Sequence, residues 1–376
     1  MIYFDNSATT NPKPHKVIFE AYNSLVNYSY NSGRGGYNSS LSAADKIYTV
    51  RERLSSLTGA LPQNIVFTQN CTFALNTAIK GLAQKGGHVL ISSLEHNAVL
   101  RPVYALSKAN VITFDVVPFY PDKAQQVKAF EERIRSNTSL IVCTMASNVF
   151  GCVMPYAEIG ALAKRHGISF VVDAAQGLGI LDVDIKRDNI DVLCCAGHKG
   201  LYGPMALGFM AVGENVSFAP LAEGGTGSLS SSEEMPDLLP DRFEAGTLSN
   251  PLIAGLGAGA EFVMNWGIDK IYNHELTLIR RIYESVSSYD KVILYTQYPK
   301  KDECVPLLSF NIEGRQSEET AQLLSEKNIA VRGGLHCAVL AHKCFSTLDS
   351  GTVRISPSLF TTKKECEFLI NCIKKL

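Results

Sequence analysis

Short apolar segments alternate with amphipathic segments through the first two thirds of the chain, and this alternation restricts the possible folds more than any other feature. Between the apolar segments, hydrophobic residues recur every three or four positions, as expected of helices. Continuous apolar strands separated by amphipathic helices predict a mainly parallel, seven-stranded α/β sheet covered on both faces. The expected strands are Asn64–Thr68, His88–Ser92, Val111–Val117, Leu140–Thr144, Ile168–Ala174, Val192–Ala196 and Leu207–Val212.

The last third of the chain has a different pattern, with fewer and shorter strands, and we predict a second, smaller α+β domain there. The boundary is expected near Gly255, which gives a large domain of residues 15–255 and a small domain of residues 256–376. The proline-containing stretch Pro220–Arg242 is expected to be a loop. In the small domain the expected strands are Leu307–Ile312, Ala330–Arg332 and Val353–Ser356.

Composition excludes several classes of protein. The 376 residues carry 35 Lys and Arg against 36 Asp and Glu, so no basic surface for nucleic acid or an anionic membrane is expected. No apolar run is long enough to cross a membrane, and the N-terminus lacks a signal-peptide pattern, which favours a cytoplasmic protein. The ten cysteines have no metal-type spacing and no framework pattern, so neither a metal site nor structural disulfides are expected.

Polar side chains follow the predicted strands at the points where the strands end. In parallel sheets, ligands bind at the carboxyl ends of the strands, so these side chains should converge on one site. Their shared position is a stronger signal than any single motif among them. The residues are Thr72, Glu95, His96, Asn148, Asp173, Gln176, His198 and Lys199.

The segment Asn64–Leu82 has the order strand, small polar turn and helix. This order places free backbone N–H groups and the positive end of a helix dipole at one point, which is a suitable site for an anion. Thr72 could contribute its hydroxyl to that site, or it could serve only as the N-cap of the helix. The pattern alone leaves both possibilities open.

Lys199 lies in Val192–Pro204, reading VLCCAGHKGLYGP, after an apolar strand and between a histidine and a glycine. A lysine, an anion site, a buried carboxylate and an aromatic ring to cover the cofactor are the groups that bind pyridoxal 5′-phosphate (PLP). The sequence supplies a residue for each. Lys199 would bond to the aldehyde, Asp173 would pair with the ring nitrogen, and His96 would lie over the ring.

Other predicted contacts complete this cofactor site. The phenolic oxygen would be bound by Asn148 and Gln176, and the phosphate by Thr72 and His198. Each assignment also has a structural alternative: Asp173 could be a helix cap, His96 a histidine of the core, and Gln176 a turn residue. The order of the residues and their shared position at strand ends favour the cofactor.

Nine stretches of the chain resemble the cysteine desulfurase/selenocysteine lyase family of class V, fold-type-I PLP enzymes. They occur in the family's order and span nearly the whole chain. The stretches are YFDNSATT, FTQNCTFALN, LEHNAVLRP, ASNVFGCVMP, VDAAQ, AGHKGLYGP, RFEAGT, VRGGLHCA and TVRIS. The resemblance implies a large PLP domain, a small C-terminal domain joined by residues 1–14, and a homodimer with active sites near the interface.

The resemblance also assigns roles to residues that pattern alone left unassigned. Arg354 would bind the substrate α-carboxylate as a bidentate partner, and Cys337 would be the nucleophile that accepts sulfur. Nearby Arg332 and His336 would favour the Cys337 thiolate, and the glycine-bearing loop 332–338 would let the thiol move. Thr247 would reach the phosphate of the neighbouring subunit.

A further candidate for substrate binding is Arg34, in the glycine-rich loop 31–39, although the composition of that loop is also typical of a flexible connector.

Some positions depart from the family pattern. Ala196 stands three residues before the lysine where many members have serine or threonine, so one phosphate hydrogen bond is expected to be missing. Cys71, included in the cofactor site, stands where threonine is common, and Phe360–Thr361 replace a Tyr-Asn pair.

By this resemblance the chain is expected to convert L-cysteine to L-alanine and to pass sulfur from a Cys337 persulfide to a protein acceptor. Lys199 would remove the Cα proton, Asp173 would stabilise the resulting negative charge through the ring, and His96 would relay a proton. Selenocysteine lyase is a close alternative, separable by comparing turnover of L-cysteine and L-selenocysteine.

Two more distant alternatives remain. An aminotransferase or C–S β-lyase of the same class would need Lys199 and Asp173 but not Cys337. A non-catalytic sulfur-relay scaffold would need none of these residues. A protein that cannot be loaded with PLP would favour the scaffold, whereas a yellow protein bleached by borohydride would exclude it.

Overall fold

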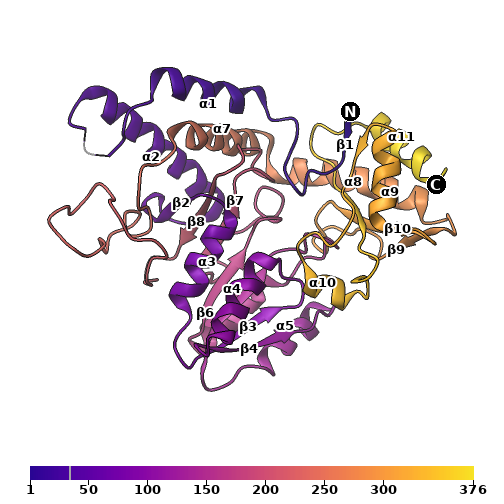
Figure 1. Cartoon of the computed structure of the whole chain (residues 1–376), viewed down its shortest axis with the longest axis horizontal. Helices are drawn as coiled ribbons and strands as arrows, with labels where there is room; N and C mark the ends of the chain where they lie inside the picture. Colours follow the sequence, from indigo (N-terminus) through magenta and orange to yellow (C-terminus); the bar gives the residue numbers. More distant parts are fainter. Residues whose placement is uncertain (34) are drawn as a thin grey trace.

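The computed structural model describes residues 1–33 and 35–376, and its centre is a seven-stranded sheet (Figure 1). The strand order is β2-β8-β7-β6-β5-β3-β4. Among the described strands, only β8 runs against the rest of this sheet, because it pairs antiparallel with both β7 and β2. The predicted mainly parallel α/β sheet is confirmed. The bounds are β2 Ile65–Thr68, β3 His88–Ser92, β4 Thr113–Val117, β5 Thr138–Thr144, β6 Ser169–Asp173, β7 Val192–Ala196 and β8 Gly208–Val212.

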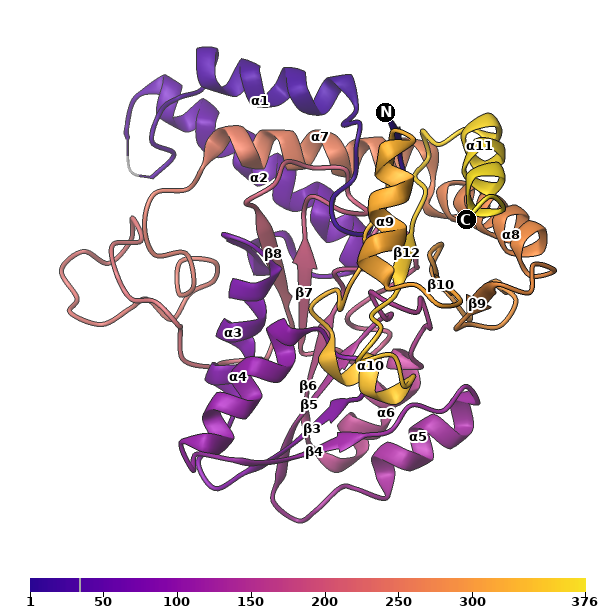
Figure 2. The ribbon, with the colours of Figure 1, turned by 45° about the vertical axis from the view of Figure 1, so that its right-hand side comes forward.

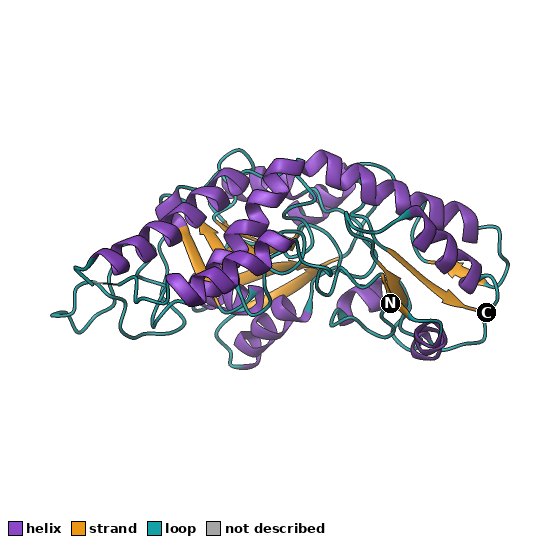
Figure 3. Ribbon diagram, turned by 90° about the horizontal axis from the view of Figure 1, so that it is seen from above, coloured by secondary structure: helices purple, strands orange, loops and turns teal. Residues whose placement is uncertain are grey.

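Helices cover both faces of this sheet (Figures 2 and 3). Strand β7 shows why both faces must be covered, since Val192 and Cys194 belong to one hydrophobic cluster while Leu193 and Cys195 belong to another. Alternate residues of a strand point to opposite faces, so a strand that is apolar throughout needs a layer on each side. One layer contains α3 Cys71–Leu82 and α4 Asn97–Lys108; the other contains α2 Asn38–Thr58, α5 Lys123–Glu131, α6 Tyr156–His166 and α7 Asn250–Trp266.

A smaller unit is built around an antiparallel sheet in the order β12-β10-β9. Its hydrophobic cluster includes Phe4, which is fully buried although it lies at the other end of the chain. The N-terminal strand β1 pairs in parallel with β11, so the N- and C-termini lie in the same part of the molecule (Figure 1). The elements are β1 Ile2–Tyr3, α8 Ile268–Val286, β9 Val292–Leu294, β10 Leu308–Ile312, α9 Ser317–Glu326, β11 Ile329–Ala330, α10 Val339–Cys344, β12 Val353–Ile355 and α11 Lys363–Ile373.

Some predicted boundaries differ from the structure. Gly255 lies inside α7, which packs on α1 (His15–Asn27), whereas the chain breaks at Gly267 between α7 and α8. The domain limits therefore stay a prediction, and Gly267 is the better candidate for the division. The expected strand Ala330–Arg332 ends at Ala330, because Arg332 instead forms an isolated bridge with Arg354.

The short elements β9 and α10 were not predicted, because a few residues carry too little periodicity to be recognised. The loop expected at Pro220–Arg242 is confirmed, since residues 213–249 contain neither helix nor strand (Figure 2). In the part of the chain that the structure describes, no helix is both long enough and apolar enough to cross a membrane.

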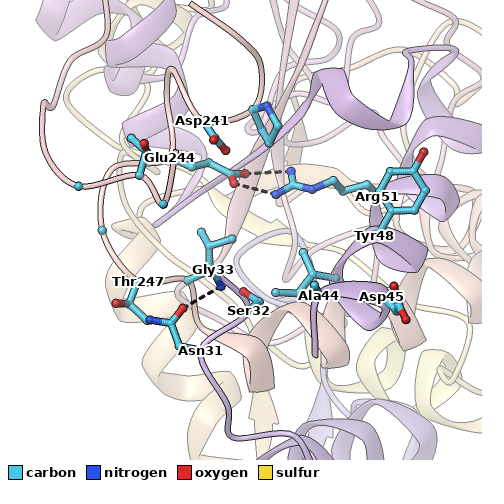
Figure 4. A pocket seen from close by; sticks show the side chains of 17 residues that line it. Asn31, Ser32, Gly33, Ala44, Asp45, Tyr48, Arg51, Asp241, Glu244 and Thr247 are labelled. Atoms are coloured by element: carbon cyan, nitrogen blue, oxygen red, sulfur yellow. Dashed lines mark hydrogen bonds and ion pairs between the residues drawn. The ribbon is translucent and has the colours of Figure 1, made fainter. Parts of the chain in front are cut away.

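One buried ion pair joins three separate parts of the large unit. Both terminal nitrogens of Arg51, on α2, contact the carboxylate of Glu244, at 2.9 and 2.7 Å. The same carboxylate accepts the backbone N–H of Phe67 in β2 at 2.6 Å, and the Arg51 guanidinium lies over the Phe67 ring. Figure 4 shows the pair in the wall of a cavity that Thr247 also lines.

We expect Glu244→Ala to lower the free energy of unfolding by about 3 to 5 kcal/mol, because it leaves the buried Arg51 charge without a partner. Urea denaturation followed by circular dichroism measures the change. As a control, Lys16→Ala breaks the more exposed pair with Glu261, and it should cost less than about 1 kcal/mol. Equal losses in the two variants would contradict this account of the buried pair.

Candidate active site

A cavity of about 240 Å³ lies at the carboxyl ends of the central strands, and the predicted site residues meet there. They come from the start of α3, from the end of β6, from the segments that follow β3, β5, β6 and β7, and from the small unit. Ten of the predicted residues line the cavity: Cys71, Thr72, His96, Asn148, Asp173, Gln176, His198, Lys199, Cys337 and Arg354. Thr247 lines a different cavity, and Arg34 lies outside the described residues.

Asp173 is the last residue of β6 and is buried. Its Oδ1 accepts the backbone N–H of Ala175 at 2.9 Å and the thiol of Cys71 at 3.6 Å. The contact with Ala175 closes a turn, and because no helix follows β6 the helix-cap alternative is wrong; the side chain also lines the same cavity as Lys199. The Asp173 carboxylate therefore stabilises the turn through Oδ1 and can still pair with a positively charged group of a ligand.

Lys199 follows β7 in a tightly packed turn. The hydroxyl of Thr10 donates to the Lys199 carbonyl at 2.7 Å, and at Gly200 a Cβ would collide with the carbonyl oxygen of Leu178. Burial lowers the pKa of the Lys199 amine, and the nearby positive charges of Arg354 and Arg332 lower it further, while Asp173 raises it. The amine is therefore closer to the neutral, nucleophilic form than an exposed lysine would be.

The anion site predicted at the start of α3 has the expected form, with one change. Asn70, not Thr72, is the N-cap residue, because its side chain accepts the backbone N–H of Phe73 at 2.9 Å. Thr72 is thus free of the capping role, and it lines the cavity with Cys71 at the start of α3, where the helix dipole is positive. The N-cap role for Thr72 is therefore wrong, and its hydroxyl as an anion contact stays a prediction.

His198 lines the same cavity as Thr72. Its carbonyl oxygen accepts the Lys13 ammonium at 2.9 Å. Burial, followed by the positive charges of Lys199 and Lys13, lowers the pKa of the His198 ring to about 4. Its Nδ1 is buried without a hydrogen-bond partner among the residues described, so a neutral ring is available to bind a ligand.

His96 is half-buried and so is not the core histidine considered as an alternative; it makes two kinds of contact. Its Nδ1 accepts the backbone N–H of Ala98 at 3.0 Å, which caps α4, while the ring lines the cavity. Burial lowers the pKa of His96, so the ring is neutral at neutral pH. Because Nδ1 accepts a hydrogen bond, the proton of the neutral ring lies on Nε2.

Arg354 is buried at the end of the cavity formed by the small unit, with 2% of its surface exposed. Its two terminal nitrogens donate to the carbonyl of Asn148 and to Oδ1 of Asp5, each at 2.8 Å. The Nε atom has no hydrogen-bond partner within residues 1–33 and 35–376. A guanidinium held in this way can present its remaining N–H groups to a carboxylate.

Asn148 and Gln176 already use one N–H each. Asn148 donates to the carbonyl of His336 at 2.8 Å, and Gln176 donates to the carbonyl of Ser7 at 3.0 Å. Each amide keeps a second N–H for a ligand oxygen. The two side chains therefore also tie the central sheet to the Cys337 loop and to the N-terminal segment.

The loop carrying Cys337 is compact and strained. His336 and Cys337 have φ angles of 48° and 56°, in the left-handed region that residues other than glycine rarely adopt. The carbonyl of Cys337 accepts the backbone N–H of Asn97 at 2.7 Å, which fixes the loop to the start of α4. Cys337 itself is exposed and lines the cavity.

The expectation that His336 favours the Cys337 thiolate by its charge is wrong. Burial and the charge of Arg354 lower the pKa of His336 to about 3, so the ring is neutral at neutral pH. Its Nε2 donates to the carbonyl of Thr352 at 2.9 Å, which identifies it as a structural residue of the loop. Arg332 does line the cavity.

Two residues near the site were given no role from the sequence, although Glu95 was among the polar residues expected at the strand ends. Asp5 forms the ion pair with Arg354, and its only signal was its place in YFDNSATT. Glu95 is fully buried behind His96, and its Oε1 accepts the Ser92 hydroxyl at 2.5 Å and the Thr144 N–H at 2.8 Å. Burial raises the pKa of Glu95 to about 8, so it is largely protonated at neutral pH.

The cavity fits PLP on its own chemistry. It contains a lysine of lowered pKa, a buried carboxylate, a helix N-terminus and a neutral histidine with an unused nitrogen. Within the described residues, Oδ1 of Asn148 is also buried and lacks a partner. Buried polar atoms without partners are rare in native proteins, and a bound ligand is one of their explanations.

Comparison with known proteins agrees with this description. The sequence profile of the family Aminotransferase class-V matches residues 2–369. The chain is 32% identical over 384 residues to a probable cysteine desulfurase from Methanothermobacter thermautotrophicus and 31% identical over 387 residues to one from Pyrococcus abyssi. Each alignment covers 100% of this chain and 94% of the relative.

Solved structures show the same fold. The apo structure of a cysteine desulfurase from Thermococcus onnurineus superposes with a TM-score of 0.90 and 28% identity, covering 100% of this chain and 94% of that one. A cysteine desulfurase from Escherichia coli, at 23% identity, superposes with a TM-score of 0.87, covering 99% and 94% of the two chains.

Ala196 lines the cavity at the end of β7, close to His198. We expect Ala196→Ser to tighten PLP binding about tenfold, because a hydroxyl there can donate a charge-assisted hydrogen bond to the phosphate. Titration of the apoprotein with PLP, followed by absorbance, measures the dissociation constant. Ala196→Val adds bulk without a donor and should not tighten binding; tightening by valine, or none by serine, would contradict the missing hydrogen bond.

Proposed function

Because the chain belongs to the class-V aminotransferase family, and its relatives are named cysteine desulfurases, we propose that it is a PLP-dependent enzyme that converts L-cysteine to L-alanine, with sulfur transferred to Cys337. The observation that carries this proposal is the position of Cys337 and Arg354 in the same cavity as Lys199 and Asp173. An aminotransferase would need the lysine and the carboxylate but would have no use for a thiol at this position.

The residues of the large unit would hold the cofactor. Lys199 would bond to its aldehyde, Asp173 would pair with its ring nitrogen, and Thr72, His198 and the N-terminus of α3 would bind its phosphate. When bound, the cofactor supplies an electron sink for negative charge that develops at the substrate Cα. The neutral His96 ring, with its proton on Nε2, would cover the ring and donate that proton within the site.

Lys199 and Arg354 would act on the amino-acid part of the substrate. Arg354, held in place by Asp5 and Asn148, would bind the α-carboxylate and so orient the Cα–H bond. The lowered pKa of Lys199 makes its free amine available as the base that removes the Cα proton. The same lysine can then return a proton to the product.

Cys337 would perform the step that distinguishes this reaction. Its thiolate would attack the substrate sulfur, forming an S–S bond while the substrate C–S bond breaks and its electron pair remains with the substrate carbon. Protonation of that carbon leads to alanine, and the sulfur remains on Cys337 as a persulfide. The exposed position of Cys337 leaves the persulfide accessible to a protein acceptor.

L-Selenocysteine would fit the same contacts, since selenium replaces sulfur without changing the amino-acid part. The site therefore supports lyase activity on selenocysteine as a second reaction, separated from the first by comparing the two turnover rates.

We also propose a cytoplasmic location, because in the described chain all ten cysteines are free thiols, as is usual in a reducing compartment.

We expect Cys337→Ala to reduce sulfide release from L-cysteine at least a hundredfold, because the nucleophile is lost, while the yellow absorbance of the PLP-loaded protein stays. Sulfide and alanine assays with a reductant present measure the change. Cys344→Ala removes another exposed thiol, outside the cavity, and should retain activity. Unchanged turnover in the Cys337 variant would refute the sulfur-transfer role and favour a different reaction of this class.

We also propose that the protein forms a homodimer. Helix α1 exposes an apolar face, with Ile18, Phe19, Tyr22, Leu25 and Val26 between 58% and 64% exposed. Such a continuous exposed patch indicates an interface. Thr247, the predicted phosphate contact from the neighbouring subunit, lies far enough from Lys199 to line a separate cavity with residues 31–33 (Figure 4). A second copy is the partner that would give Thr247 this role.

We expect the wild-type protein to be a dimer in solution and Phe19→Asp/Tyr22→Asp to be a monomer, because two buried charges would oppose association. Size-exclusion chromatography with light scattering measures the mass. Phe368→Asp places a charge on α11, at a separate exposed aromatic residue, and should leave the dimer intact. A monomeric wild-type protein, or a dimeric double variant, would contradict the proposed interface.

A further inference from the structure

Two cysteines outside the active-site cavity lie opposite each other in the structure. Cys152 follows Asn148 in the segment after β5, and Cys304 precedes β10 in the small unit. They form an isolated antiparallel bridge, although 152 positions separate them in the chain (304 − 152). Neither residue has a role in the proposed reaction.

The hydrogen bonds around this bridge define its geometry. The N–H of Val153 donates to the carbonyl of Glu303 at 3.0 Å, and the N–H of Val305 donates to the carbonyl of Gly151 at 2.8 Å. Cys152 and Cys304 are thus a non-hydrogen-bonded pair, the closer of the two antiparallel pair types. In such pairs the Cα atoms are about 4.5 Å apart and the side chains point to the same face. Disulfides form at Cα separations of about 4.4 to 6.8 Å, so this pair meets the requirement.

The surroundings of the two thiols are similar. Both are partly buried and pack against the main hydrophobic cluster of the large unit. Burial raises the pKa of Cys152 to about 12, and Cys304 raises it further. Burial likewise raises the pKa of Cys304 to about 12, although the charge of Arg280 opposes this.

The two cysteines join segments that position active-site residues. Residues 146–153 form a small hairpin, closed by the bridge between Ala146 and Val153, and this hairpin carries Asn148. Ser309, at β10, donates its hydroxyl to the carbonyl of Val149 at 2.5 Å. A covalent bond at the adjacent pair would therefore fix the Asn148 hairpin to the small unit that carries Arg354 and Cys337.

We propose that Cys152 and Cys304 form an intramolecular disulfide when the protein meets a low-molecular-weight disulfide such as oxidised glutathione, and that this bond links the Asn148 hairpin to the small unit. One cysteine thiolate attacks the glutathione disulfide, forming a mixed disulfide and releasing one glutathione thiolate. The second cysteine thiolate then attacks the protein sulfur of that mixed disulfide and releases the second glutathione. The two protein thiols are oxidised, the glutathione disulfide is reduced to two thiols, and the two protons end on those thiols.

Cys152 and Cys304 should form a disulfide more slowly than the cysteines of an exposed redox sensor. Because only the thiolate attacks a disulfide and both thiols have raised pKa values, the bond should form slowly at neutral pH and about tenfold faster for each pH unit up to about pH 9. Once formed, it closes a large loop and removes freedom from the unfolded chain, so the oxidised protein should unfold at a higher temperature than the reduced protein.

The test uses the full-length wild-type protein incubated with oxidised glutathione, after which free thiols are blocked with iodoacetamide. Peptide mass spectrometry without reduction should find the Cys152 peptide joined to the Cys304 peptide, with loss of two hydrogen atoms. Cys304→Ser should abolish the linked peptide and the rise in melting temperature. Cys344→Ser is the matched control, because Cys344 lies close enough to affect the pKa of Cys152, and it should retain both.

Three results would overturn the proposal. The first is that both cysteines remain alkylated, or carry only glutathione, after prolonged incubation at pH 9. The second is that Cys152 is linked to Cys344 instead of Cys304. The third is that the linked peptide forms but the melting temperature rises no more than in Cys304→Ser, which would show that the bond does not hold the Asn148 hairpin and the small unit together.

Discussion

Burial of Lys199 opposite Asp173 is the interaction on which the rest of the site depends. Removing an ammonium group from water lowers its pKa, and a nearby carboxylate opposes that change, so the balance between the two sets how readily the amine becomes neutral. The parallel sheet achieves this balance because β6 and β7 are neighbours and end at the same edge. The fold thus brings the Lys199 amine and the Asp173 carboxylate to the same edge of the sheet.

The second constraint is that the site closes only when segments distant in sequence meet. Arg354 donates hydrogen bonds to Asp5 in the N-terminal segment and to Asn148, which follows the central strand β5. The Asn148 side chain in turn donates a hydrogen bond to the Cys337 loop. A buried guanidinium needs such partners to offset its desolvation. The contacts that keep Arg354 buried therefore also hold the Cys337 loop against the end of the central sheet.

Much of the fold and the site could be predicted from the sequence. The strands of the large unit are apolar throughout and are followed by polar residues, so their order alone placed His96, Asp173 and Lys199 at one edge. What could not be predicted depends on contacts between distant segments. The ion pair of Asp5 with Arg354 and the burial that neutralises His336 leave no periodic signal. The N-cap at Asn70 was missed because two neighbouring polar residues fitted the same role.

The proposed transfer of sulfur to Cys337 is tested most directly by mass spectrometry of the wild-type protein after brief incubation with L-cysteine and no reductant. The peptide containing Cys337 should gain the mass of one sulfur atom, and alanine should be released in equal amount during the first turnover. Alanine release with no added sulfur on Cys337, or added sulfur on another cysteine in its place, would contradict the assignment.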